Sequence, residues 1–330
     1  MPTLSLEDAR KQVAQALMRC RTSADNAAAV ARALVAAEAD GLKGHGLARV
    51  PRYAAQAQVG KVDGFAAPSV SRPRPAVIAI DAANGFAYPA LDAAVAALPQ
   101  AARATGIAAA SIRRSHHCGV AGHPVERLAE DGLVALMLAN TPAAIAPWGG
   151  SRGVFGTNPI AFACPLPERP PIVVDLSLSK VARGNILAAR QRGERIPHGW
   201  ALDGAGRPTT DPRAALAGTM LPLGDAKGTA LALAVELLAA GLTGANFAGE
   251  ASSFLDAEGG PPGTGQILIA FDTAAFAGAS AFSRFAELAA AIESQPGARL
   301  PGSRRLAARR RAQEQGIAVE DALLAEISAL

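Results

Sequence analysis

Short apolar segments alternate with alanine-rich helical segments through the middle of the chain, and this alternation constrains the fold more than any other feature. Strands are predicted at Val77–Asp81, Ile107–Ile112, Leu133–Leu138 and Ile172–Leu176 and in GTNPIAFACP and GTGQILIAFD, with helices at Leu91–Thr105 and ending at Gly132. Strands that alternate with helices indicate an α/β domain. Their spacing here is not that of a regular doubly wound sheet, so another α/β arrangement is expected.

The two ends of the chain are predicted to be helical. Leu6–Ala39 fits two helices, the first capped by Ser5 and the second by Thr22 or Ser23, and Pro51–Gln58 fits a third. Further helices are expected at Ser283–Ser294, after Leu300 and at Glu320–Leu330. The segment GKVDGFAAPSVSRPRP, residues 60–75, is rich in glycine and proline. It is predicted to be a loop that ends the first domain.

Composition excludes several classes of protein. Half of the residues are hydrophobic but only 4% are aromatic, and the net charge is +4. A nucleic-acid surface would need basic clusters interleaved with stacking aromatics, which are missing, so no nucleic-acid partner is expected. The three cysteines have no metal-ligand spacing and are odd in number. With no signal-like start and no long apolar run, we expect a cytoplasmic protein with no membrane partner.

The stretch DGLKGHGLARVPRY, residues 40–53, has the composition of a catalytic turn. His45 lies between Gly44 and Gly46, at a break in the helical pattern, and Arg49 follows four residues later. A histidine transfers protons near neutral pH, and an arginine fork binds a carboxylate. This pair suits a 2-oxo acid or a cyclic 2-imino acid during hydride transfer. From the stretch alone, the plainer alternative is a helix-capping histidine beside a surface arginine.

No familiar nucleotide or metal motif is present. The chain has no GxGxxG after the first strand, no Walker sequence, no GxSxG and no HExxH. His116, His117 and His123 do not have a usual metal-ligand spacing, so no metal is expected. Ser115, His116 and Gly119 lie at a strand-to-helix turn that suits either a phosphate or a plain turn.

Two later segments contain no recognisable catalytic or binding motif but have an unusual length or composition. Residues 195–212, RIPHGWALDGAGRPTTDP, are long and polar for a connection, and loops of this length are often functional. The helix predicted from Gly228 to Leu242 is too apolar to face solvent. It is expected either inside the protein or between subunits.

Taken together and in order, the motifs of this chain resemble the type 2 malate/L-lactate dehydrogenase family. They are HGLARVPRY, SHHCGVAGH, APWGG, GTNPIAFACP, VVDLSLSKVARG, IPHGWALDGAGRPTTDP, GDAKG and LPG. Within the family, GLARVPRYAAQAQVGKVDG and EASSFLDAEGGPPGTGQ are most similar to the Δ1-pyrroline-2-carboxylate/Δ1-piperideine-2-carboxylate reductases.

The resemblance implies a particular fold and assembly. It implies an α/β NAD(P)-binding domain that is not a Rossmann fold, over residues 73–283. A mainly helical domain, residues 1–72 joined by the C-terminal helices 284–330, would lie beside it. Members of the family are typically homodimers, so a homodimer is expected.

The resemblance also implies site residues. His45 matches the proton donor, and Arg49 and Thr157 match substrate contacts. The matching cofactor contacts are His116, His117, Cys118, Gly119, Val120, Asp175, Leu176, Ser177, Arg183, Gly184, Lys227, Gly228, Pro301, Gly302, Ser303, Arg304 and Arg305. Two positions depart from the imine reductases: Gly44 replaces a serine and Asn185 an aspartate, residues thought to assist the histidine as a relay.

The expected function is NADPH-dependent reduction of Δ1-pyrroline-2-carboxylate to L-proline, and of Δ1-piperideine-2-carboxylate to L-pipecolate as a second reaction. Hydride would go to C2 while His45 gives a proton. Arg183, Arg304 and Arg305 favour NADPH over NADH, because a 2′-phosphate needs a cationic partner. The first alternative is an NAD(P)-dependent malate- or lactate-type 2-hydroxy-acid dehydrogenase. The second is a non-catalytic NADP-binding relative, suggested by Gly44 and Asn185.

Overall fold

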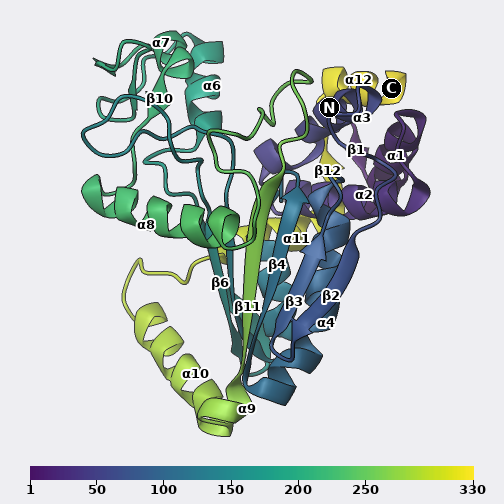
Figure 1. Ribbon diagram of the computed structural model, residues 1–330, viewed down its shortest axis with the longest axis vertical. Coiled ribbons are helices and arrows are strands. Elements are labelled where there is room, and N and C mark those ends of the chain that lie inside the picture. Colours follow the sequence, from purple (N-terminus) through teal and green to yellow (C-terminus); the bar gives the residue numbers. More distant parts are fainter.

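A mixed seven-stranded sheet forms the centre of the computed structural model, which describes residues 1–330 (Figure 1). Its strands lie in the order β2 (Ser69–Arg74), β3 (Val77–Asp81), β4 (Ile107–Ser115), β11 (Thr264–Asp272), β5 (Leu133–Ala139), β6 (Ile160–Leu166) and β7 (Arg169–Leu176). Only β3 and β4 run parallel; every other neighbouring pair is antiparallel. The fold is therefore mixed α/β, with the late strand β11 inserted between β4 and β5.

Side chains of β11 alternate between two apolar layers, as the two-residue period of a strand requires. Leu268 and Ala270 belong to the main core, which is covered by the helices α4 (Ala87–Thr105) and α5 (Gly122–Glu130). Ile267 and Ile269 instead face the helix α8 (Ala226–Glu236), which continues into a π-helical turn, η3 (Leu237–Gly241). The sheet is thus covered on both faces.

The two ends of the chain meet on one side of the molecule. The helices there are α1 (Leu6–Arg19), α2 (Ala24–Ala39), α3 (Val50–Gln58), α11 (Ser303–Gln315) and α12 (Asp321–Ala329). A two-stranded ribbon joins the ends, because β1 (Thr3–Leu4) pairs with β12 (Ile317–Ala318), and the termini lie close together in Figure 1. Ser5 and Ser23 cap α1 and α2 by accepting from the backbone N–H groups three residues on. The capping prediction is confirmed.

The remaining elements form a lobe and an outer helix. The lobe holds α6 (Arg183–Arg192), α7 (Pro212–Ala217) and a three-stranded sheet of β8 (Ala201–Leu202), β9 (Pro208–Thr209) and β10 (Thr219–Met220). The short α9 (Thr273–Phe276) leads into α10 (Ala279–Glu293), which packs against β6. The region 195–212, expected to be a loop, therefore contains two short strands.

The prediction of a loop over residues 60–75 is wrong at Ser69–Arg74. This segment is the edge strand β2, paired with β3. All six residues are exposed, so no apolar alternation marks the strand, and Pro73 is tolerated because an edge strand can lack a ladder donor. Several other boundaries differ: α4 begins at Ala87, β4 extends to Ser115, β7 begins at Arg169 and α10 begins at Ala279.

One continuous core of 52 buried residues extends from α1 and α2 to β6 and β7. The division into residues 1–72 with 284–330 and residues 73–283 stays a prediction. None of the helices combines the length and apolar character needed to cross a lipid bilayer.

Candidate active site

The last turn of α2 fixes where His45 lies. The Gly41 N–H donates to the Glu38 carbonyl and the Leu42 N–H to the Ala37 carbonyl, both at 2.9 Å, and Gly41 is left-handed with φ +77°. This is the Schellman pattern that ends many helices. Two short 3₁₀ turns, η1 (Lys43–His45) and η2 (Leu47–Arg49), follow at once.

The Glu38 side chain stabilises these two turns through a hydrogen bond to their backbone. Its Oε2 accepts from the Leu47 backbone N–H at 2.9 Å in a buried position. A Cβ at Gly46 would lie 2.2 Å from the same oxygen, so residue 46 must be glycine for the carboxylate to approach the backbone. Burial raises the pKa of Glu38. The carboxyl group thus holds the backbone directly after His45.

Arg49 is oriented but not neutralised. Its Nε donates to the Gly44 carbonyl at 2.8 Å, while its Nη1 is buried and has no partner. Buried polar atoms are nearly always hydrogen-bonded, so an unpaired guanidinium nitrogen indicates a place for a ligand oxygen. One turn later, Arg52 forms no ion pair, and its pKa is lowered by burial and by the charge of Arg49. Arg52 is exposed, and the opposite charge of Glu326 on α12 acts against this lowering.

The ring of His45 stacks on that of His117, with centroids 5.3 Å apart and planes 14° apart. Its Nδ1 is buried without a partner, and its Nε2 has none but is not buried. Burial, followed by the charges of Arg49 and His123, lowers the pKa of His45 to about 4. His45 is therefore neutral at pH 7, and Nε2 is the ring nitrogen that is not fully buried. Gly44 has open space where a side chain would lie.

Aromatic side chains surround the second histidine. The buried Tyr53 hydroxyl lies 2.6 Å from Nδ1 of His117 and 3.1 Å from the Tyr88 hydroxyl. Phe254 lies over both His116 and His117, with ring centroids 5.2 Å from each. The fully buried Lys61 holds the segment that follows Phe254, because its Nζ donates to the Asp256 and Glu258 carbonyls and to the Asp256 carboxylate.

His116 is almost entirely buried, and neither of its ring nitrogens has a partner. Burial, with Arg49 and Lys61 nearby, lowers its pKa to about 3. Its carbonyl accepts from the Thr264 hydroxyl and the Gln266 amide. These contacts tie the loop after β4 to β11.

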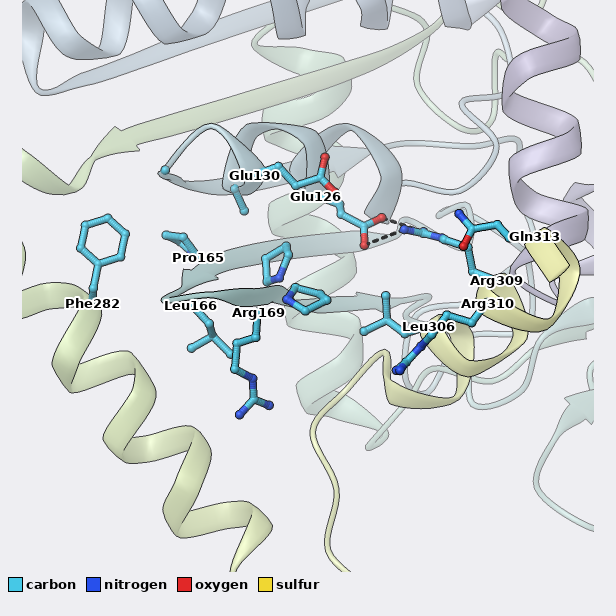
Figure 2. Close-up of a pocket in the computed structure, with 14 residues that line it drawn as sticks. Glu126, Glu130, Pro165, Leu166, Arg169, Phe282, Leu306, Arg309, Arg310 and Gln313 are labelled. Atoms are coloured by element: carbon cyan, nitrogen blue, oxygen red, sulfur yellow. Dashed lines mark hydrogen bonds and ion pairs between the residues drawn. The ribbon is translucent and has the colours of Figure 1, made fainter.

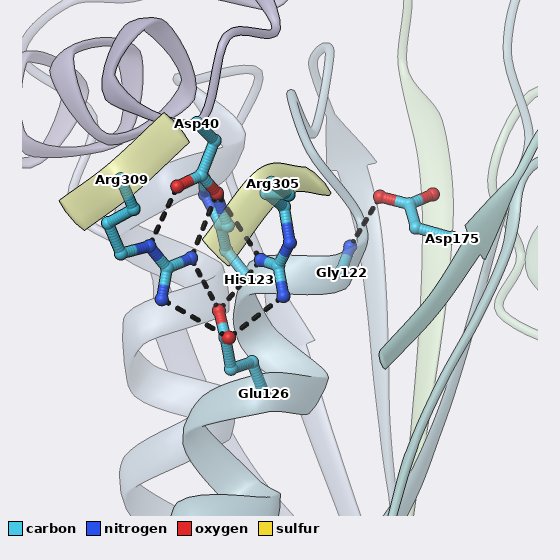
Figure 3. A network of polar contacts seen from close by, with 7 residues as sticks. All are labelled: Asp40, Gly122, His123, Glu126, Asp175, Arg305 and Arg309. Atoms are coloured by element: carbon cyan, nitrogen blue, oxygen red, sulfur yellow. Dashed lines mark hydrogen bonds and ion pairs between the residues drawn. The ribbon is translucent and has the colours of Figure 1, made fainter. Parts of the chain in front are cut away.

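The rest of this loop is tightly constrained. Cys118 and Val120 are buried, and Gly119 is left-handed at φ +69°, where a Cβ would lie 2.7 Å from the Tyr88 hydroxyl. The loop ends at α5, where the Gly122 N–H donates to the Asp175 carboxylate at 2.7 Å (Figure 3). The structure thus joins two predicted cofactor segments, and a carboxylate occupies the helix start where a phosphate was considered.

The predicted C-terminal cofactor segment, residues 301–305, lies against β7, and its two arginines have different surroundings. A Cβ at Gly302 would lie 3.3 Å from the carbonyl of Val173 in β7. Arg305 is engaged by Asp40 and Glu126 in a buried network (Figure 3). Arg304 is exposed and has no ion pair, and Pro301 and Ser303 flank the same turn. Of the two arginines, Arg304 is the one free to meet an anion.

Other predicted cofactor residues lie at the starts of α6 and α8. Arg183 begins α6, donates weakly to the Leu216 carbonyl and keeps a buried Nε without a partner; Gly184 beside it is exposed. Lys227 is exposed and unpaired near the start of α8. Gly228 packs so closely on the Leu223 carbonyl that a Cβ would lie 1.8 Å from its oxygen.

Thr157 and Ser177 make local hydrogen bonds. The Thr157 N–H donates to the Thr141 hydroxyl at 2.8 Å, and the Ser177 hydroxyl lies 3.1 Å from that of Ser179, while Leu176 is exposed. Next to Thr157, the Asn158 amide donates to the Glu236 carboxylate on α8 at 2.8 Å. The GTNP turn is thus fixed against α8, and no hydrogen bond links Thr157 to His45 or Arg49.

A cavity of about 610 Å³ lies elsewhere, between α5, the β6–β7 hairpin, α10 and α11 (Figure 2). Its walls include Arg309, Arg310, Leu306 and Phe282. Neither His45 nor Arg49 lines it. It is separate from the His45 chemistry.

Sequence reasoning missed Tyr88, Phe254 and Lys61. Lys61 and Phe254 stand in segments noted for other reasons, but no spacing links Lys61 to Asp256 or Phe254 to His117, because these contacts form only when distant segments pack. Tyr53 closed the His45 stretch and was assigned no role. Aromatic residues make up only 4% of this chain, so an aromatic side chain next to His45 and Arg49 was the one available sign that Tyr53 belongs to the site.

The residues present fit a phosphorylated nicotinamide cofactor. Arg304 and Lys227 carry unpaired charges, and Arg183 has a buried nitrogen without a partner. Unpaired cations of this kind suit phosphate oxygens.

Comparison with known proteins decides the family. The sequence profile described as malate/L-lactate dehydrogenase matches residues 4–328. The chain belongs to this family. The resemblance of the motifs is confirmed, and the protein is an oxidoreductase.

Its relatives within the family differ in substrate. The chain is 50% identical to (2R)-3-sulfolactate dehydrogenase (NADP(+)) of Chromohalobacter salexigens, over 96% of this chain and 94% of the relative. It is 41% identical to Δ1-pyrroline-2-carboxylate reductase of Ancylobacter novellus, over 99% and 97%. It superimposes on Δ1-piperideine-2-carboxylate reductase of Pseudomonas syringae pv. tomato with a TM-score of 0.95 at 39% identity, covering 100% and 99%.

Proposed function

We propose that this oxidoreductase uses NADP(H) to interconvert a small dianionic 2-hydroxy acid and its 2-oxo acid, with (2R)-3-sulfolactate as the leading substrate. The observation that carries the proposal is the buried Arg49 Nη1, which has no partner and lies near the neutral His45; Arg52, one turn later, is the cation proposed for the second anionic group. The sulfolactate dehydrogenase that is 50% identical supports the choice of substrate. This proposal develops the 2-hydroxy-acid alternative.

Each residue has a defined task in oxidation. Arg49 pairs with the carboxylate through the nitrogen that lacks a partner, which fixes C2 relative to His45. Arg52 faces the second anionic group. Nε2 of His45 accepts the proton of the 2-hydroxyl as C2 becomes a carbonyl, and returns it in the reverse direction. When bound, the nicotinamide supplies the hydride acceptor, or the hydride donor in reduction.

The cofactor is proposed to lie along the loop after β4, the end of β7, the starts of α6 and α8, and the turn before α11. Arg183, Lys227 and Arg304 hold its phosphates. Arg305 supports the turn through its ion pairs and does not bind phosphate itself. Thr157 is retained as a proposed substrate contact. NADP(H) is preferred to NAD(H) because of these cations and because the sulfolactate relative is named for NADP(+).

The second candidate is reduction of Δ1-pyrroline-2-carboxylate or Δ1-piperideine-2-carboxylate, to L-proline or L-pipecolate. It is supported by the relative at 41% identity and by the solved piperideine-2-carboxylate reductase. Arg49 would bind the single carboxylate, and His45 would protonate the ring nitrogen. Gly44 disfavours it, since Nδ1 of His45 has no partner where the imine reductases have a serine; Asn185 at the exposed start of α6 is the second departure.

A substrate comparison on the purified protein tests the proposal. NADP⁺ reduction is measured with (2R)- and (2S)-3-sulfolactate, L-malate and L-lactate, and NADPH oxidation with the two cyclic imines. We expect kcat/KM for (2R)-3-sulfolactate to exceed every other value by at least roughly tenfold. Faster turnover of the imines would establish the second candidate. If the protein binds NADPH but turns over none of these substrates, the non-catalytic alternative would be supported instead.

We also propose a cytoplasmic homodimer. The three cysteines are unpaired, which suits a reducing compartment. α8 and η3 bury one apolar side against the sheet but leave a second apolar side exposed, which holds Leu231, Leu233, Leu237, Leu238 and Leu242. A partner subunit is the proposed cover.

A further inference from the structure

A hydrogen-bonded chain of three buried groups leads to the edge of the site. The Tyr53 hydroxyl lies between Nδ1 of His117 at 2.6 Å and the Tyr88 hydroxyl at 3.1 Å. Tyr53 comes from α3, Tyr88 from α4 and His117 from the loop after β4. Three separate elements thus converge on a ring that stacks on His45.

The number of available protons determines which group donates in each of these hydrogen bonds. Tyr53 is the only hydrogen-bond partner of the Tyr88 hydroxyl, so Tyr88 must donate to it or leave its own proton without an acceptor in the protein. Tyr53 then donates to Nδ1 of His117. The length of 2.6 Å agrees, because bonds with O–H donors are shorter than those with N–H donors. His117 consequently accepts at Nδ1.

The groups in this chain are neutral, which the assignment requires. Burial raises the pKa of Tyr53 to about 12 and that of Tyr88 well above its ordinary value, so both keep their protons. Burial lowers the pKa of His117 well below its ordinary value, with Arg49, His45 and His116 adding to the effect. A neutral imidazole that accepts at Nδ1 carries its proton on Nε2.

The Nε2 edge of His117 is available to a ligand. This nitrogen has no protein partner, and unlike both nitrogens of His116 it is not fully buried, although His117 as a whole is buried. We propose that Tyr53 is a positioning residue that holds His117 in the Nε2–H tautomer, so that it presents a hydrogen-bond donor beside His45. The site then contains a proton acceptor and a fixed donor on parallel rings 5.3 Å apart.

The Nε2–H of His117 donates to an oxygen of a bound molecule. That this molecule is a substrate or a nicotinamide rests on the proposed function. Two sources supply such an oxygen: the substrate, at its 2-oxygen or carboxylate, and the carboxamide of the nicotinamide. The assignment of the tautomer does not depend on which source is correct.

Nitrogen NMR of the protein labelled with ¹⁵N-histidine tests the tautomer without any substrate. His117→Asn identifies the resonances of His117. In the native protein, we expect Nδ1 at the unprotonated position and Nε2 at the protonated position between pH 6 and 8. In Tyr53→Phe the pattern should shift toward the other tautomer or an average. A protonated Nδ1 in the native protein would overturn the proposal.

Kinetics of Tyr53→Phe and its matched control Tyr88→Phe test the consequence. Tyr88→Phe removes an equally buried hydroxyl but leaves Tyr53 able to donate to His117. We expect Tyr53→Phe to lower kcat/KM about tenfold and Tyr88→Phe to change it less than about threefold. A loss with unchanged Kd for NADPH assigns the donor to the substrate, whereas a matching rise in that Kd assigns it to the carboxamide. Equal effects of the two variants would show that these hydroxyls contribute only to packing and would contradict the proposal. If no substrate turns over, the NMR result still decides the tautomer.

Discussion

At the scale of single residues, the environment of His45 determines which form of the imidazole meets a substrate. Burial and the charges of Arg49 and His123 favour the neutral form, and no side chain of residue 44 reaches Nδ1. A neutral imidazole accepts a proton from a hydroxyl directly. The same ring must gain a proton before it assists reduction, so oxidation and reduction should respond differently to pH.

The pH dependence of oxidation follows from this. Because kcat/KM reports the free enzyme, a His45 pKa of about 4 predicts constant kcat/KM for oxidation from pH 8 to about pH 5 and a decline only as pH falls toward 4. The measurement is initial-rate oxidation of (2R)-3-sulfolactate by NADP⁺ across this range. A half-maximal point near the ordinary histidine value of about 6.5 would contradict the assigned environment.

Sequence reasoning found the residues that carry local signals and missed those that depend on packing. His45 and Arg49 were evident because glycines interrupt a helical pattern around them. Arg305 was assigned to the cofactor from its position in a motif. In the structure Asp40 and Glu126 reach it from two other elements, and nothing in the linear sequence places those carboxylates there.

At the scale of elements, a network of buried charges joins α2, α5 and α11 (Figure 3). Asp40, at the end of α2, accepts from His123, Arg305 and Arg309, and Glu126 accepts from both arginines. Burial alone would raise the pKa of Asp40, but the hydrogen bonds from Arg309 and His123 outweigh it and lower the pKa to about 2. The network holds α11 against the turn that carries His45.

Removing one charge from this network should be costly. Asp40→Asn leaves two arginines with only Glu126, and breaking a buried pair typically costs about 3–5 kcal/mol. We expect the free energy of unfolding in urea at pH 7 to fall by an amount of that order. Since the Asp40 pKa is lowered in the folded state, the difference from the native protein should shrink as pH falls from about 4 to 2.

Asp92→Asn is the matched control, because Asp92 also pairs with two arginines but at the surface. It should cost less than about 1 kcal/mol. Similar losses in the two variants would show that burial of the Asp40 network contributes no additional stability.

The elements themselves were predictable where periodicity was strong. Leu268 and Ala270 alternate with Ile267 and Ile269 along β11, and capping serines precede α1 and α2, so type and limits followed from local rules. The edge strand β2 has neither pattern, since all its side chains are exposed. The insertion of β11 between β4 and β5 is a long-range pairing that no local rule specifies.

At the scale of the whole molecule, the apolar surface of α8 and η3 is the feature that a single chain leaves unexplained. The sequence indicated a helix either inside the protein or between subunits. The exposure of Leu233, Leu237 and Leu242 excludes the first alternative for those side chains. Apolar patches of this kind often mark protein interfaces.

The dimer proposal predicts a specific change in mass. Leu237→Glu places a charge in the proposed interface, and we expect light scattering after gel filtration to shift from twice the chain mass toward one chain mass. Met18→Glu, on exposed apolar surface of α1, is the matched control and should remain dimeric. A native protein that elutes as a monomer would contradict the proposal.

The central claim is that His45 exchanges a proton with a substrate that Arg49 holds while hydride moves at C2. Single-turnover kinetics of His45→Ala with saturating NADP⁺ and (2R)-3-sulfolactate tests it most directly, alongside the Kd for NADPH. We predict a fall of about 10²–10⁴-fold in the rate of NADPH formation, with the Kd for NADPH changed less than about threefold. A rate within about tenfold of the native protein, or a loss matched by weaker cofactor binding, would contradict the account.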